Sequence, residues 1–363
     1  MQQTPIISII IPVYNKDYAL KHTLQSIQNQ GLSDFEVLLI DDGSTDSSPI
    51  ICDAFQKLDN RFVAIHKSNG GVSSARNMGL DMMRGKYVFF CDADDELPEN
   101  ALSALVSAQE KSGAELVIGG FAYKNINTGN IASPYTLVRS EMLLKMKELN
   151  QTAELLWREN NMLTACTRLF LADIIRENHI RFDESLIVLE DFDFVLSYLK
   201  YVKIIQGIKE CSYFQILGYG VESFRAKVDY IDDIKPVYDK FIHFLDIYGI
   251  PQSDSVMKEI NLVITEDLKK LSMAIPKKHA DYRDRKKRSR EIMSFPCVQQ
   301  ALKSVEWDEN TQYLIDTYGI MKWLYGIAIQ LKRIHDDYPI VRQDKGIVVS
   351  YLWKLKNYIS LYI

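Results

Sequence analysis

The sequence predicts an α/β protein with a mostly parallel sheet flanked by helices, followed by a helical C-terminal region. Over the first 120 residues, short apolar runs typical of strands alternate with segments of helical periodicity, the pattern of a parallel sheet covered by helices. Polar clusters follow the ends of several of these runs. From about residue 230 the pattern is helical alone, so the 363 residues divide into two predicted domains, 1–228 and 229–363.

The elements of the first domain follow in order. Apolar and β-branched runs predict strands at 6–13, 36–40, 62–66, 87–91 and 115–118. Helical periodicity predicts helices at 17–30, 47–58, 73–83 and 99–111. Local signals agree, because Pro49 and Pro98 suit a first helical turn and Gly31, Gly85 and Gly113 follow predicted helices. Residues 135–225 show mixed periodicity, and further helices are predicted at 231–248, 253–271, 292–305 and 318–334.

Composition indicates a globular protein. Apolar residues make up 47% of the chain and charged residues 25%, which suits a large buried core. The formal net charge of -5 argues against nucleic acid as a partner. No run reaches the ~18 uncharged apolar residues of a membrane span, and no basic segment precedes the first apolar run, so a cytoplasmic location is expected. The five cysteines lack metal-site spacing and are expected to be small buried residues.

Three carboxylates follow the predicted strand at 87–91. Asp92, Asp94 and Asp95 share one turn, and ligands gather beyond the carboxyl ends of parallel strands. A departing nucleoside diphosphate gains negative charge, so its site needs a hard cation with oxygen ligands. We therefore expect Asp94 and Asp95 to hold Mn2+ or Mg2+ and Asp92 to reach a ribose, although which of the three binds the metal stays open. The alternative is an ordinary solvated acidic turn.

Other polar residues occur at neighbouring strand ends. Asp42 follows the second predicted strand and could accept a hydrogen bond from a nucleotide base, on which Tyr14, after the first strand, could stack. Arg76 could place its guanidinium near a diphosphate or could pair with Asp92. Each residue alone has a structural alternative, such as a turn or an exposed charge. Together at three strand ends, they favour a nucleotide site.

Four segments, in this order and spacing, resemble the signature of glycosyltransferase family 2. They are residues 8–15 (SIIIPVYN), 41–46 (DDGSTD), 71–77 (GVSSARN) and 92–95 (DADD). The resemblance covers about residues 5–225. It implies a GT-A fold, which is Rossmann-like, a nucleotide-sugar donor that is usually a UDP-sugar, a divalent metal, and inversion at the anomeric carbon. It also adds Pro12 and Ala75 to the donor-binding residues Tyr14, Asp42, Arg76 and Asp92.

An inverting transfer needs a base that takes the proton of the acceptor hydroxyl. In the family this base is the Asp of a Glu-Asp pair that precedes a helix, and Glu190-Asp191 resembles that pair. The resemblance therefore implies Asp191 as the base, with Glu190, Arg168 and Arg225 as supporting residues. The alternative is a carboxylate favoured only by the helix dipole.

The C-terminal region lies outside the resemblance. Residues 277–290 hold eight Lys or Arg against two Asp, and residues 353–363 are aromatic, basic and apolar. Core packing or a homodimer interface would explain them. The other interpretation is peripheral contact with the inner face of the cell membrane, because Trp, Tyr and Lys favour the headgroup region, where lipid-linked acceptors reside.

The expected function is sugar transfer to a hydroxyl of a glycan, a lipid-linked oligosaccharide or a glycoprotein. A sugar nucleotidyltransferase is a competing class, but it needs a Gly-rich, Arg-containing loop that residues 12–16 lack. A catalytically idle nucleotide-sugar-binding or scaffold protein is the other alternative. Such a protein would be expected to have lost Asp94 or Asp191, and the chain has both.

Overall fold

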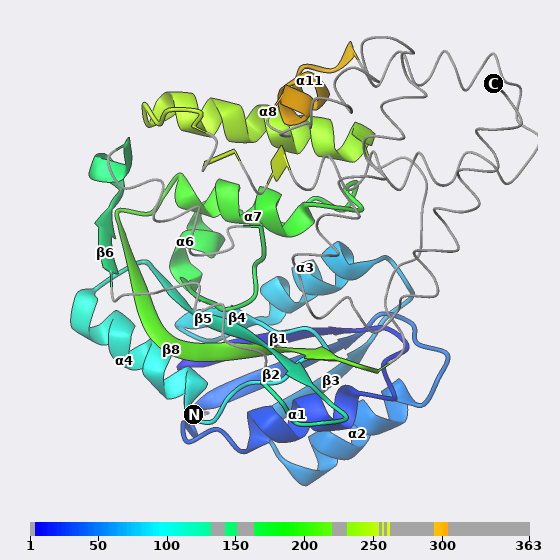
Figure 1. Cartoon of the computed structure of the whole chain (residues 1–363). Coiled ribbons are helices and arrows are strands. Elements are labelled where there is room, and N and C mark those ends of the chain that lie inside the picture. The colour runs from blue at the N-terminus through cyan, green and yellow to red at the C-terminus, as the bar shows by residue number, and fades with distance from the viewer. Residues whose placement is uncertain are drawn as a thin grey trace, which may run out of the picture. The chain divides into compact units, whose positions relative to one another are not determined.

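The computed structural model describes residues 4–131, 142–150, 163–219, 231–253, 256–257, 260–261 and 294–303. The chain divides into two compact units, Met1–Ile260 and Asn261–Ile363. The first unit contains the whole described sheet (Figure 1). In the second unit the structure describes one helix, α11 (Pro296–Lys303).

The described strands form one mixed sheet, in the order β3-β2-β1-β4-β7-β5-β8-β6. They are β1 (Ile7–Val13), β2 (Phe35–Asp41), β3 (Phe62–His66), β4 (Tyr87–Phe90), β5 (Leu116–Asn125), β6 (Met142–Lys145), β7 (Arg168–Leu171) and β8 (Ile204–Leu217). Strand β1 is parallel to β2 and β4, and β2 is parallel to β3. Strand β7 is antiparallel to both β4 and β5. The carboxyl ends of β1, β2 and β4 therefore meet at one edge of the sheet.

Helices lie on both faces of this sheet. They are α1 (Leu20–Gln28), α2 (Ser48–Leu58), α3 (Val72–Met82), α4 (Ala101–Ser112), α6 (Ala172–Glu177), α7 (Glu190–Leu199) and α8 (Ile231–Ile247), with a 3-10 turn, η1, at Met146–Glu148. In Figure 1, α1 and α2 lie below strands β1 to β3, and α3 lies above them. Helix α8 packs on α7, where the rings of Phe192 and Phe241 lie 5.2 Å apart and Lys240 forms an ion pair with Asp193.

A cluster of phenylalanines fixes β4, β7 and α7 to one another. The ring of Phe90, at the end of β4, lies 5.2 to 5.8 Å from those of Phe170, Phe182 and Phe194. Phe182 and Phe194 also stack on each other at 4.2 Å. Buried aromatic pairs add about 0.5–1.5 kcal/mol each to the energy of burial. Because Phe90 lies two residues before Asp92, this packing sets where the α7 carboxylates lie relative to the end of β4.

The mostly parallel sheet flanked by helices confirms the predicted fold class. Strands β1 to β5 and helices α1 to α4 match the predicted elements within a few residues, except that β5 continues to Asn125. Strands β6, β7 and β8 were not predicted, and β7 is inserted antiparallel between β4 and β5. Helices α8 and α11 match the helices predicted at 231–248 and 292–305.

Other parts of the C-terminal prediction stay predictions. The first compact unit reaches Ile260 and includes α8, which lies beyond the boundary predicted at 228/229. The helix predicted at 318–334 and the segments 277–290 and 353–363 lie outside the described residues, as does most of 253–271.

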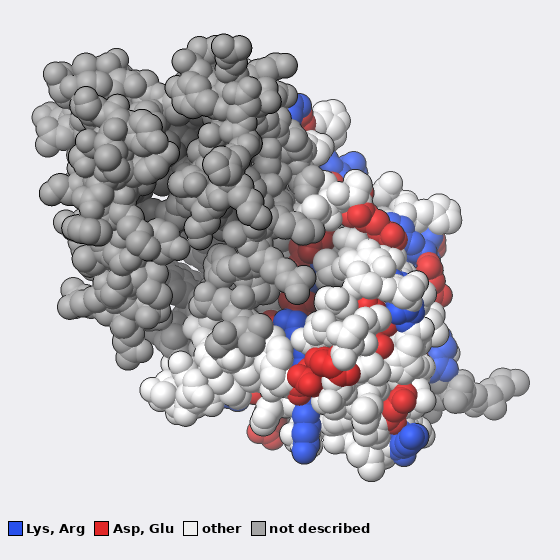
Figure 2. Space-filling view, turned by 90° about the vertical axis from the view of Figure 1, so that its right-hand side faces the viewer, with Lys and Arg blue, Asp and Glu red and all other residues white. Residues whose placement is uncertain are grey.

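The surface of the described residues carries charges of both signs. On the face drawn in Figure 2, acidic and basic side chains are interspersed. Among the described residues, none of the helices combines the length and the apolar character that a membrane crossing requires. Of the five cysteines, four are buried and Cys211 is partly exposed, and all are free thiols.

Candidate active site

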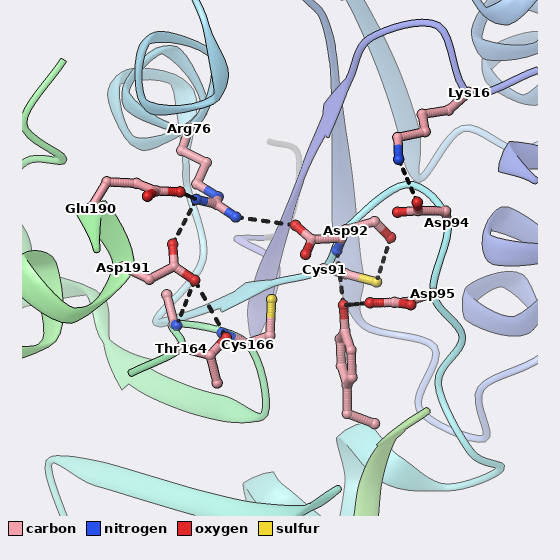
Figure 3. A network of polar contacts seen from close by, with 12 residues as sticks. Lys16, Arg76, Cys91, Asp92, Asp94, Asp95, Thr164, Cys166, Glu190 and Asp191 are labelled. Carbon is pink, nitrogen blue, oxygen red and sulfur yellow. Dashed lines mark hydrogen bonds and ion pairs between the residues drawn. The ribbon is translucent and has the colours of Figure 1, made fainter. Parts of the chain in front are cut away.

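The predicted site residues gather at the edge of the sheet where β1, β2 and β4 end. Tyr14 follows β1 and is 40% exposed to solvent. Asp42 follows β2 and is buried. Asp92 lies after β4, and Arg76 extends towards it from α3 (Figure 3). Helix α7 begins at Glu190, which brings Asp191 to the same place.

Arg76 lies at the centre of this group of carboxylates. Its Nη1 donates to Asp191 Oδ1 at 2.6 Å and to Glu190 Oε1 at 3.3 Å, and its Nη2 donates to Asp92 Oδ1 at 3.1 Å (Figure 3). Burial lowers the pKa of Arg76, but the charges of Asp191 and Asp92 outweigh this and raise it above its usual value. The structure thus shows Arg76 paired with Asp92, one of the two predicted roles. It joins a carboxylate after β4 to the pair at the start of α7.

Asp191 is held from both sides. While Oδ1 accepts from Arg76, Oδ2 accepts from the backbone N–H of Ala165 at 3.0 Å and from the hydroxyl of Thr164 at 3.3 Å. Its side chain is 16% exposed, so a small part of it remains open to a ligand. The carboxylate is therefore fixed in orientation and still partly accessible to solvent.

Glu190 lies beside Asp191 and differs from it in its contacts. One of its carboxylate oxygens, Oε1, accepts from Arg76, and the side chain is 17% exposed. Burial, together with the charge of Asp191, raises the pKa of Glu190 to about 7, although Arg76 opposes this. A proton is therefore available on this carboxyl near neutral pH.

Glu190→Gln is expected to flatten the pH dependence of stability. In the folded protein Glu190 has a pKa of about 7, whereas the usual glutamate pKa of 4.5 describes the unfolded chain. Between these values the folded state binds more protons, so its stability falls as the pH rises through this window. Urea denaturation at pH 5, 6, 7 and 8 should show a smaller fall for the variant than for the wild type. Glu99→Gln, at an exposed position, should follow the wild type, and parallel curves for all three proteins would contradict the prediction.

Asp95 faces the sheet. Its Oδ1 accepts from the backbone N–H of Ile216 at 2.9 Å, and its Oδ2 lies 2.7 Å from the hydroxyl of Tyr213. That hydroxyl accepts from the backbone N–H of Asp92 at 3.1 Å. Burial, followed by the charge of Asp92, raises the pKa of Asp95 to about 8. Asp95 and Tyr213 thus attach the acidic turn to β8.

Asp92 and Asp94 offer oxygens for a cation. Each keeps one carboxylate oxygen without a partner among the described residues, since Arg76 contacts only Oδ1 of Asp92 and Lys16 only Oδ2 of Asp94. Within the described part of the chain, no three His, Cys, Asp or Glu residues are arranged to hold a metal ion by themselves. Mg2+ binds typically through one or two carboxylates together with substrate phosphates. The two aspartates therefore fit a hard cation whose coordination the donor would complete.

The other predicted donor-binding residues differ in their exposure. Asp42 is 3% exposed, and its carboxylate accepts from the backbone N–H groups of Gly70 at 2.9 Å and Gly71 at 2.8 Å. Gly71, with φ of +91°, has the left-handed backbone that favours glycine, and it caps α3. Pro12 is partly exposed, and Ala75 is fully buried.

Sequence reasoning missed several residues that organise the site. Lys67 forms an ion pair with Asp42. The side chain of Asn77 donates to the carbonyl of Phe182 and accepts from its backbone N–H, both at 2.9 Å, which fixes the segment that precedes α7. The position of Asn77 directly after Arg76 in the third motif was the signal that could have identified it.

Of the two arginines predicted as supporting residues, the structure describes one. Arg168 is fully buried and donates to the carbonyls of Thr164 and Cys166, so it supports the turn that contacts Asp191. Arg225 lies outside the described residues.

Comparisons with known proteins show what this chain is similar to. Residues 8–177 match the family model described as Glycosyl transferase family 2. The uncharacterized glycosyltransferase EpsJ of Bacillus subtilis is 27% identical over 319 residues, which span 82% of this chain and 86% of EpsJ. Glycosyltransferase GlyG of Streptococcus pneumoniae is 37% identical over 126 residues, which span 34% of this chain and 42% of GlyG.

The fold is also that of a solved structure. S. aureus TarS 1-349, crystallised in complex with UDP-GlcNAc, superposes with a TM-score of 0.58 at 16% identity, covering 92% of this chain and 93% of that one. This likeness shows a GT-A-like fold. Together with the order of the four motifs, the match of the family model establishes that residues 8–177 belong to glycosyltransferase family 2.

Proposed function

We propose that the protein transfers a sugar from a UDP-sugar to a hydroxyl group of a glycan, a lipid-linked oligosaccharide or a glycoprotein, with inversion at the anomeric carbon. The observation that supports this most directly is the bridge from Asp92 through Arg76 to Asp191. This bridge supports the proposal because it joins Asp92, the proposed donor-side carboxylate, to Asp191, the proposed base. TarS was solved with UDP-GlcNAc, which makes UDP-GlcNAc the first donor to test.

On the donor side, the residues that follow β1, β2 and β4 bind different parts of the nucleotide sugar. Tyr14 and Asp42 contact the base, and Asp92 contacts the ribose or shares the cation with Asp94. Asp94 would hold Mn2+ or Mg2+, with Asp95 as a second ligand or, as its contacts with Tyr213 and Ile216 favour, as the anchor of the turn. The bound cation would offset the charge that develops on the departing diphosphate.

On the acceptor side, Asp191 takes the proton of the attacking hydroxyl. The acceptor oxygen forms a bond to the anomeric carbon while the bond to the diphosphate breaks, and the proton passes to a carboxylate oxygen of Asp191. Arg76, Thr164 and Ala165 hold that carboxylate in one orientation. A base fixed in this way needs little rearrangement when the acceptor binds.

The proposal is tested by release of UDP. A panel of UDP-sugars, beginning with UDP-GlcNAc, is incubated with the protein and Mn2+, and UDP is measured with and without EDTA. We expect slow UDP release that EDTA stops, and a rise in melting temperature with the preferred donor, because ligands that bind the folded state stabilise it. An idle scaffold would be stabilised by the donor but would release no UDP. A protein that is neither stabilised nor active with any donor would contradict the proposal.

A further inference from the structure

Lys16 lies at the end of β1 and forms an ion pair with Asp94 (Figure 3). Its ammonium group contacts Oδ2 of Asp94 and lies 3.2 Å from the hydroxyl of Tyr18. The side chain of Lys16 is 23% exposed and that of Asp94 is 26% exposed, so ions and phosphates from solution can reach the pair. The carboxylate proposed to bind a metal therefore already has a protein cation on one of its oxygens.

The backbone around Lys16 is anchored to the loop that follows β2 and to the first residue of α2. The N–H of Asn15 donates to the hydroxyl of Ser44 at 3.0 Å, and the N–H of Lys16 donates to the hydroxyl of Ser48 at 2.8 Å. Asn15 itself has φ of +51°, a conformation that such contacts must hold in place. The Cα of Lys16 is therefore fixed, while its four-carbon stem leaves the ammonium group able to change position.

Two other cationic side chains at this edge of the sheet are more deeply buried with their acidic partners. Arg76, whose side chain is 4% exposed, contacts three carboxylates. Lys67, whose side chain is 13% exposed, pairs with Asp42. Among the described residues, Lys16 has one acidic partner, and that partner is Asp94. Of these three cations, Lys16 can exchange its partner with the least disturbance to the fold.

We propose that Lys16 is an exchangeable counter-ion of the donor site. Before the donor binds, its ammonium group neutralises Asp94; when the nucleoside diphosphate and its cation bind, the ammonium group leaves Asp94 and pairs with a diphosphate oxygen. This inference rests on the proposed function, because it takes the diphosphate and the cation from there. A divalent cation on the open oxygen of Asp94 would lie close to the ammonium group on the other oxygen, and the two positive charges would repel each other. Lys16 therefore opposes binding of the cation alone and favours binding of the nucleotide, which makes the two ligands bind cooperatively.

Lys16→Met separates these two effects, because it removes the charge and keeps the stem. Mn2+ alone is titrated into the protein, and free Mn2+ is measured by its electron paramagnetic resonance signal. UDP binding is measured by calorimetry at saturating Mn2+. We expect the variant to bind Mn2+ alone about threefold to tenfold more tightly and UDP about threefold to tenfold more weakly than the wild type, as for loss of a partly exposed ion pair. If Lys16 only supported the fold, its replacement by Met would not change the affinities for Mn2+ and UDP in opposite directions.

Two further variants serve as controls. Lys21→Met, at an exposed position on α1, should leave both affinities unchanged. Lys16→Arg keeps the charge and should bind UDP as the wild type does. A Lys16→Met protein that binds Mn2+ and UDP with wild-type affinity would overturn this inference, as would weaker binding of both. If the wild type itself does not bind UDP in the presence of Mn2+, the proposed function fails, so the two failures are distinguishable.

Discussion

Asp191→Asn is expected to reduce kcat for sugar transfer by about a thousandfold while donor binding stays close to that of the wild type. A positioned base contributes typically 10²–10⁴-fold to the rate, and an amide cannot take the proton of the acceptor hydroxyl. The substitution preserves the size of the side chain, which lies between Arg76 and the backbone of Ala165. We therefore expect the loss to fall on the chemical step.

The measurement compares kcat with UDP-sugar affinity for the same protein. Asp193→Asn is the matched control, because Asp193 lies on the same first turn of α7 but pairs with Lys240, on the side where α8 packs. This control should transfer sugar at nearly the wild-type rate and lose only some stability. An Asp191→Asn protein that retains more than about a tenth of the wild-type kcat would exclude Asp191 as the base.

Arg76→Met is expected to lower the free energy of unfolding by about 3–5 kcal/mol near pH 8, the usual cost of removing one partner from a buried ion pair. The guanidinium is the shared cation of Asp92, Glu190 and Asp191, and its side chain is 4% exposed. Without it, three carboxylates face one another in a partly buried site. Their mutual repulsion, rather than lost packing, should dominate the effect.

The dependence on pH distinguishes repulsion from packing. Loss of the cation raises the carboxyl pKa values in the folded variant, so the folded state binds more protons than the unfolded chain and gains stability as the pH falls. Urea denaturation should therefore show a smaller deficit at pH 5 than at pH 8. Arg181→Met, which breaks an exposed pair with Asp81, should change stability by about 0.5 kcal/mol or less. A deficit of equal size at both pH values would assign the effect to packing against Phe182.

The parts of the fold that were predictable are those encoded in local pattern. Strands β1 to β4 are short apolar runs that end in polar turns, and this order predicts a parallel sheet. Strand β7 was missed because it begins with a charged residue, Arg168. That arginine is fully buried because nearby carbonyl oxygens accept its hydrogen bonds, and a sequence pattern does not show such partners.

The site could be predicted as a set of residues but not as a network. Carboxylates after strands indicate a cation and a nucleotide, and the pair Glu190-Asp191 is recognisable by its resemblance to the family. The contacts of Lys16 and Asn77 depend on partners 78 and 105 residues away in the chain, so no local signal reveals them. Arg76 was predicted to lie at the site, but its link to Asp191 spans 115 residues and became visible only in the structure.

The position of β7 has a consequence for how the protein is made. Strands β4 and β5 do not pair with each other, because β7, which is synthesised later, lies between them. A nascent chain that ends before Arg168 therefore leaves one edge of β4 and both edges of β5 unpaired, because β8 is also synthesised later, and such edges are prone to pair with other chains. Contacts of high sequence separation also form slowly. Ribosome-bound chains of increasing length should thus remain sensitive to protease between β4 and β5 until β7 has emerged.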